Sequence, residues 1–127
     1  MSAKKSNKTA SLEQIILRFT RSGNLEEFRI YLKESRNEIL TWKHPRSGEN
    51  CLLLCARYGH TEILRCLSEE YNESLEQWNN DSKRALHEAA LGGHLECVKN
   101  LISRNVEIDC LKRADWLVMI QFCINYH

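Results

Sequence analysis

The sequence predicts an all-α solenoid of helix-turn-helix repeats. Three segments align when each is written around a glycine: QIILRFTRSGNLEEFRIYL at Gly23, NCLLLCARYGHTEILRCLS at Gly59 and RALHEAALGGHLECVKNLI at Gly93. The glycines are 36 and 34 residues apart, close to the period of about 33 residues typical of one class of helical repeat. Apolar residues recur at helical spacing on both sides of each glycine. We therefore expect each segment to form two short helices joined by a glycine turn.

The first repeat, expected over residues 12–44, is degenerate. It keeps Gly23 but has Phe19 and Thr20 where the later repeats have small side chains. Terminal repeats of solenoids commonly depart from the pattern because they cover the end of the stack. Before it, residues 1–11 are polar and rich in lysine, without the apolar run of a signal peptide or membrane span. We expect them to form a disordered basic tail.

The second and third repeats, expected over residues 45–78 and 79–111, carry the clearer pattern. Small side chains at Cys55-Ala56 and Ala89-Ala90 would let the first helix of each repeat approach its neighbours closely. Larger Leu, Ile and Val side chains of the second helix would fill the layer between repeats. A half repeat is expected over 112–127, where the apolar run LVMIQFCI should dock on repeat three or remain exposed and prone to association. Since the pattern stops after Trp116, we hypothesise an alternative or incomplete end of a longer protein.

This pattern resembles the ankyrin repeat, whose consensus centres on Thr-Pro-Leu-His-x-Ala-Ala-x-x-Gly-His. The residues that match it are Leu52, Ala56, Gly59, His60, Leu86, His87, Ala89, Ala90, Gly93 and His94. Pro and the capping Thr are absent at the start of each first helix, and only Asn50 is a plausible replacement cap. The resemblance implies that His87 and His94 hold turns together by hydrogen bonds, although Arg84 stands where the usual Thr partner of His87 would be.

The histidines, glutamates and cysteines of the third repeat also raise the alternative of a metal or catalytic site. The stretch RALHEAALGGHLECVKNL lacks the second histidine of a His-Glu-x-x-His motif, because Leu91 stands there. Cys51 and Cys55 are one helical turn apart, but the chain lacks the Cys-x-x-Cys knuckles common in structural zinc sites. In a chain without a secretory signal the six cysteines are expected to be thiols. We therefore expect a non-enzyme without metal or cofactor.

Binding would use the loop tips before each first helix and the inner face of those helices. The formal charge of +1 provides no global basic field for nucleic acid. By repeat register, the expected partner-binding residues are Arg46, Ser47, Glu49, Arg57, Tyr58, Asn80, Asp81, Lys83, Leu91, Asp115 and Trp116. Trp42 and Trp78, nearer the repeat junctions, are expected to pack against the fold.

A closer resemblance covers residues from about Glu49 to Trp116 and includes the stretch DCLKRADW. It is to ankyrin-repeat proteins that act with alanyl-tRNA synthetase and help prevent misincorporation of serine, with lysine side chains accepting the activated serine. The resemblance implies alanyl-tRNA synthetase as partner, Lys112 as a serine acceptor, and a cytoplasmic or nuclear location. Arg113 stands where those proteins have a second lysine, and Arg is not a useful amine nucleophile. The alternative is a truncated scaffold or competitor fragment that binds another protein partner.

Overall fold

The computed structural model describes residues 2–104 and 106, with side chains from Leu12 onward. Its helices are α1 (Ser2–Ser22), α2 (Leu25–Thr41), α3 (Cys51–Tyr58), α4 (Thr61–Arg65) continuing into a π-helical turn η1 (Cys66–Glu70), α5 (Ala85–Leu91) and α6 (Leu95–Ser103). Within the described residues the only bridge between extended segments joins Trp78 to Arg84. None of the described helices is both long and apolar enough to cross a membrane. The prediction of an all-α repeat fold is therefore confirmed.

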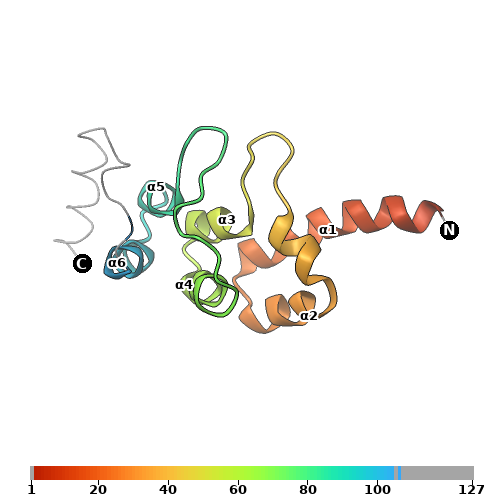
Figure 1. Cartoon of the computed structure of the whole chain (residues 1–127), viewed down its shortest axis with the longest axis horizontal. Coiled ribbons are helices and arrows are strands. Elements are labelled where there is room, and N and C mark those ends of the chain that lie inside the picture. Colours follow the sequence, from red (N-terminus) through yellow and green to blue (C-terminus); the bar gives the residue numbers. More distant parts are fainter. Residues whose placement is uncertain (1, 105, 107–127) are drawn as a thin grey trace.

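The helices pack in pairs, α1 with α2, α3 with α4 and α5 with α6, and these pairs follow one another along the molecule (Figure 1). Helix α3 packs against both α1 and α5, while α4 packs against α2 and α6. The first helices of the pairs thus make one row, the inner row, and the second helices make another. The two long connections, between α2 and α3 and between η1 and α5, project on the same side (Figure 1). This arrangement brings loops about one repeat apart in sequence next to one another.

Helix α1 is longer than the sequence pattern predicts. It begins at Ser2, so the backbone of residues 2–11 is helical where we expected a disordered tail. Neither Gly nor Pro occurs between residues 2 and 22, so no helix-breaking residue interrupts this stretch. The domain boundary at residue 11 and the boundaries between repeats stay predictions.

Glycines and asparagines set the ends of the helices. Gly23, Gly59 and Gly93 have φ of +72°, +76° and +72°, the left-handed conformation predicted for the turn within each repeat. Asn50 caps α3 as predicted, its Oδ1 accepting a hydrogen bond of 2.9 Å from the Leu53 N–H. Asn24 caps α2 in the same way, through a bond of 3.1 Å to the Glu27 N–H. Each cap satisfies a backbone donor that the first turn of a helix leaves without a partner.

The small side chains expected on the inner helices are buried, but large apolar side chains are buried on both rows, including Leu52, Leu53 and Leu86 on the inner helices. Cys55, Ala56, Ala89 and Ala90 are all buried on the inner helices. The second helices contribute larger buried side chains, which are Ile63, Leu64, Leu67, Val98 and Leu101. In the first repeat an aromatic pair fills the same layer. The rings of Phe19 and Phe28 lie 4.8 Å apart between centroids, which explains how this repeat packs without an Ala-Ala pair.

Candidate protein-interaction surface

Two loops, residues 43–50 and 77–84, form what we call the tip loops, and they are bonded to one another. The N–H of Asn80 donates to the Ser47 carbonyl at 2.9 Å, and the side-chain amide of Asn80 donates to the Arg46 carbonyl at 2.9 Å. Within its own loop, Asn79 Oδ1 accepts from the N–H groups of Asp81 and Lys83 at 2.9 and 3.1 Å. Asn79 therefore holds the shape of the second tip loop, and Asn80 joins that loop to the first.

The first tip loop has its own internal bonds. His44 Nδ1 accepts from the backbone N–H groups of Arg46 and Ser47 at 3.1 and 3.4 Å, so the proton of a neutral His44 ring lies on Nε2. The His44 N–H donates to the Glu49 carbonyl at 2.7 Å, closing the base of the loop. Gly48 takes a φ of +73°, which a glycine adopts without strain. The loop is thus held in one shape by its own backbone and by His44.

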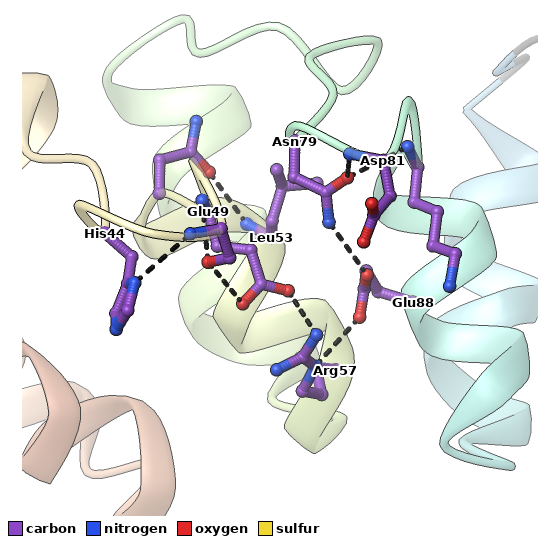
Figure 2. Close-up of polar contacts among 10 residues, drawn as sticks. His44, Glu49, Leu53, Arg57, Asn79, Asp81 and Glu88 are labelled. Carbon is purple, nitrogen blue, oxygen red and sulfur yellow. Dashed lines mark hydrogen bonds and ion pairs between the residues drawn. The ribbon is translucent and has the colours of Figure 1, made fainter.

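An arginine bridges the tip loops to the inner helices (Figure 2). Arg57, on α3, contacts Glu49 through its Nη2 and bonds Glu88 of α5 through its Nε at 2.9 Å. Asn79 Nδ2 donates to the other oxygen of Glu88 at 3.2 Å, and Ser47 Oγ donates to Glu49 at 3.3 Å. Both carboxylates are buried, whereas the Arg57 side chain is 44% exposed. The positive guanidinium of Arg57 therefore compensates the negative charge of two buried carboxylates, Glu49 in the first tip loop and Glu88 on α5.

Glu49 corrects one expectation about exposed binding residues. It was expected at an exposed tip, but only 3% of it is exposed. Burial raises the pKa of its carboxyl above the ordinary value, and Arg57 acts in the opposite direction. Its place under the loop makes Glu49 a structural partner of Arg57 rather than a surface available to a ligand.

The remaining expected binding residues lie where a partner could reach them, with one group outside the described part. Arg46, Asn80 and Asp81 are exposed on the tip loops, and Ser47 and Lys83 are half-buried there. On the inner row, Tyr58 and Leu91 are exposed at the ends of α3 and α5. Lys112, Asp115 and Trp116 lie outside the described residues. The role of all these residues in binding remains a prediction.

Trp78 corrects a second expectation. It was expected to pack against the fold, as the half-buried Trp42 does, but 60% of Trp78 is exposed. The Arg84 guanidinium lies over its ring, 5.6 Å from the centroid, and also bonds Glu76 at 3.0 Å. Since Trp78 belongs to a loop, no helical periodicity marks it as buried or exposed. The only sign in the sequence that Trp78 could be exposed was its position directly before the turn-forming residues Asn79 and Asn80.

His87 takes part in a turn hydrogen bond, as predicted, whereas the hydrogen bonds expected of His94 stay a prediction. The Arg84 N–H donates to His87 Nδ1 at 2.9 Å. The backbone of residue 84 therefore bonds His87 although the threonine of the repeat consensus is absent there. His94 lies against Gly59 and His60 lies against Gly23, each leaving no room for a Cβ there. His60 Nε2 is also 3.1 Å from the Arg21 carbonyl. Each histidine at the start of a second helix therefore covers the turn of the preceding repeat.

The thiols of the described residues are packing groups. Cys51, Cys55, Cys66 and Cys97 are buried and unpaired. Burial raises the pKa of Cys66 and of Cys97 to about 11, so neither is a thiolate at neutral pH. Over residues 12–104, His, Cys, Asp and Glu side chains nowhere gather in a group of three suited to a metal ion.

Comparison with known proteins agrees with this architecture. A family model for three ankyrin repeats matches residues 15–112. Among solved structures, a chain from the crystal structure of the complex between the yeast ribosomal protein Rps3 and its chaperone Yar1 is similar, with a TM-score of 0.63 and 27% sequence identity. That match covers 76% of this chain and 71% of the other. The chain therefore belongs to the ankyrin-repeat family.

Proposed function

We propose that the chain is a non-catalytic protein-interaction module that binds its partner through the tip loops and the inner face. The observation that carries this proposal is the bonding of the two tip loops to each other and, through Arg57, to the inner helices. Loops held in one conformation before binding lose little conformational entropy when a partner docks. The exposed Arg46 and Asp81 are therefore presented at fixed positions. The similarity to a chain from a complex of a ribosomal protein with its chaperone also favours a protein partner.

The inner face adds apolar contacts to these polar tips. Tyr58 is 36% exposed and Leu91 is 49% exposed, at corresponding ends of neighbouring inner helices. Tyrosine and arginine are over-represented among the anchors that contribute most to protein interfaces, so Tyr58 and the partly exposed Arg57 are the strongest candidates on this face. A partner lying along the inner row would bury all three side chains.

For the identity of the partner, we infer alanyl-tRNA synthetase from sequence resemblance. The segment from about Glu49 to Trp116, with its DCLKRADW stretch, resembles the N-terminal repeats of ankyrin repeat domain-containing protein 16. This chain would then act as a co-regulator of the synthetase that helps prevent serine misincorporation, with Lys112 as an acceptor of activated serine. The neutral amine of an acceptor lysine attacks the carbonyl carbon of seryl-adenylate, forms an amide and breaks the bond between the carboxyl group and the phosphate, which releases AMP and a proton.

The partner is tested by capture of purified alanyl-tRNA synthetase on the immobilised chain. We expect capture by the intact chain and weaker capture by Tyr58→Ala and Trp116→Ala. Ile30→Ala is the matched control, because Ile30 is 56% exposed on α2, away from the inner row. No capture by the intact chain would exclude this synthetase as the partner. Lys112 is tested separately by mass spectrometry after incubation with the synthetase, serine and ATP, where Lys112→Arg should lose the seryl adduct.

A further inference from the structure

We propose that a slot between the two tip loops binds an acidic, extended segment of the partner protein. The slot is lined by Lys43, Asn50, Gln77 and Trp78 and has an open volume of about 260 Å³. In the bound state a carboxylate of the segment lies beside Lys43 and an apolar side chain lies against Trp78. This inference rests on the proposed function and adds the chemistry of the partner to it.

The polar groups of the slot have fixed orientations. Asn50 uses its Oδ1 to cap α3 and its Nδ2 to donate to Gln77 Oε1 at 2.7 Å. Gln77 Nε2 donates in turn to the Ser74 carbonyl at 2.9 Å. Each amide nitrogen carries two hydrogens and uses one of them in these bonds. The lining of the slot therefore combines side-chain amides with the exposed ammonium group of Lys43, which suits a ligand that carries a carboxylate, such as an acidic peptide.

Trp78 provides the apolar side of the slot. It is the most exposed of the large hydrophobic residues in the described part of the chain. The guanidinium of Arg84 over its ring and the backbone bridge from Trp78 to Arg84 both hold it in place. An exposed indole of fixed position gives a partner a large contact area at little entropic cost. The volume of the slot is below the range of about 300–1,000 Å³ typical of small-molecule pockets, which favours one or two side chains of a larger ligand.

The charge around the slot favours an acidic partner. Within the described residues, Lys43, Arg46 and Lys83 enter no ion pair, and all three belong to the tip loops. Asp81 is the one acidic side chain of these loops that is likewise unpaired in the described part, since Glu49 is bonded to Arg57. The loops thus present three positive side chains against one negative. Complementary charge of this kind increases the rate of association and excludes basic partners.

Nucleic acid is the less favoured ligand for the same surface. Nucleic-acid binders neutralise many phosphates with a stripe of basic residues, and each contact adds to a steep salt dependence. This chain has 18 basic and 17 acidic residues, so the excess at the tip loops is local and small. A short acidic protein segment matches a local excess better than a continuous phosphate backbone does.

The test measures binding of three fluorescent probes to the full chain by anisotropy. The first is a short peptide in which glutamates alternate with leucine and phenylalanine, the second replaces every glutamate with lysine, and the third is a single-stranded DNA oligonucleotide. We expect the glutamate peptide to bind and the lysine peptide not to bind. Trp78→Ala should weaken binding of the glutamate peptide about tenfold or more, as an interface anchor does. Lys43→Glu should weaken it about tenfold, less at high salt.

Two control variants keep the result specific. Ile30→Ala removes an exposed apolar side chain from α2, and Lys33→Glu reverses an exposed charge there, and neither should change binding. Thermal unfolding of Trp78→Ala, followed by circular dichroism, checks that the variant is folded. Equal affinity for the two peptides, tighter binding of the oligonucleotide, or insensitivity to both slot variants would each overturn the inference. Capture of the synthetase that survives Trp78→Ala and Lys43→Glu would overturn the slot alone, while the proposed function would stand.

Discussion

The glycines at the turns differ in what a side chain would meet there, as Gly59 and Gly93 show. Its φ of +76° is unfavourable for any residue with a Cβ, and a Cβ built there would lie 2.5 Å from His94 Nδ1. Gly93 has a similar φ of +72°, but a Cβ there would meet nothing within 4 Å. An alanine at either position would therefore bear a similar backbone strain, but only at Gly59 would it also collide with a histidine.

We expect Gly93→Ala to lower the free energy of unfolding by about 1–2 kcal/mol, the cost of the left-handed conformation. Gly59→Ala should lower it further, because the His94 ring must also move. Urea unfolding followed by circular dichroism measures both changes. Equal losses for the two variants would show that the contact with His94 contributes nothing.

Glu49 links a buried carboxyl to the pH dependence of stability. Burial raises the pKa of its carboxyl from the ordinary 4.5, so the folded chain holds this proton at pH values where the unfolded chain has released it. The contribution of Glu49 to stability therefore falls as pH rises from 4.5 through the raised folded value, and the penalty is absent below 4.5.

Glu49→Gln removes this titration. As pH rises above 4.5, the free energy of unfolding of the variant should therefore fall less than that of the native chain. Urea unfolding at a series of pH values provides the comparison. Glu62→Gln is the control, because Glu62 is an exposed side chain on α4. A slope of stability against pH that is unchanged in Glu49→Gln would mean that another group carries the dependence.

At the scale of elements, the caps decide where helices begin. Asn50 satisfies the first turn of α3 and also bonds Gln77, whereas Asn24 caps α2 at an exposed position. Asn24→Ala should cost about 1 kcal/mol, the typical value for a lost cap. Asn50→Ala should cost more, about 2 kcal/mol, since the buried N–H of Leu53 and the Gln77 amide both lose a partner. Chemical unfolding measures the two variants, and a smaller loss for Asn50→Ala than for Asn24→Ala would refute this reasoning.

The elements also show what the sequence could predict. The helix pairs around each glycine, the burial of Ala89 and Ala90 and the Asn50 cap followed from local patterns, because periodicity and capping act over a few residues. The position of Glu49 did not, because its partners Arg57 and Glu88 belong to other elements and meet it only in the fold. Trp78 was placed wrongly for a related reason. In a loop, exposure depends on tertiary packing, which neither periodicity nor register describes.

For the whole molecule, the stacking of inner helices predicts cooperative unfolding. Helix α3 packs against both α1 and α5, so a change in its core should be felt in all three repeats. Leu53 is fully buried on α3, and Leu53→Ala should lower the free energy of unfolding by about 2–5 kcal/mol. Ile30→Ala, at an exposed position, should change it by less than about 0.5 kcal/mol.

Two signals test this cooperativity in Leu53→Ala. Circular dichroism reports helix content, and fluorescence of the three tryptophans, Trp42, Trp78 and Trp116, reports the surroundings of those side chains. We expect both signals to give one coincident transition at lower urea concentration. Separate transitions would show that the repeats unfold independently of the central one.

The bonds from Asn80 to Ser47 and Arg46 fix the distance between the two tip loops, and this distance constrains any partner that contacts both loops. Because these bonds cross from one loop to the next, the loops cannot spread apart or slide without breaking them. The spacing between successive contact positions is then a constant of the molecule. We expect a segment that binds across both tip loops to place its side chains at that spacing, so that inserting a single residue between two of its anchors weakens binding.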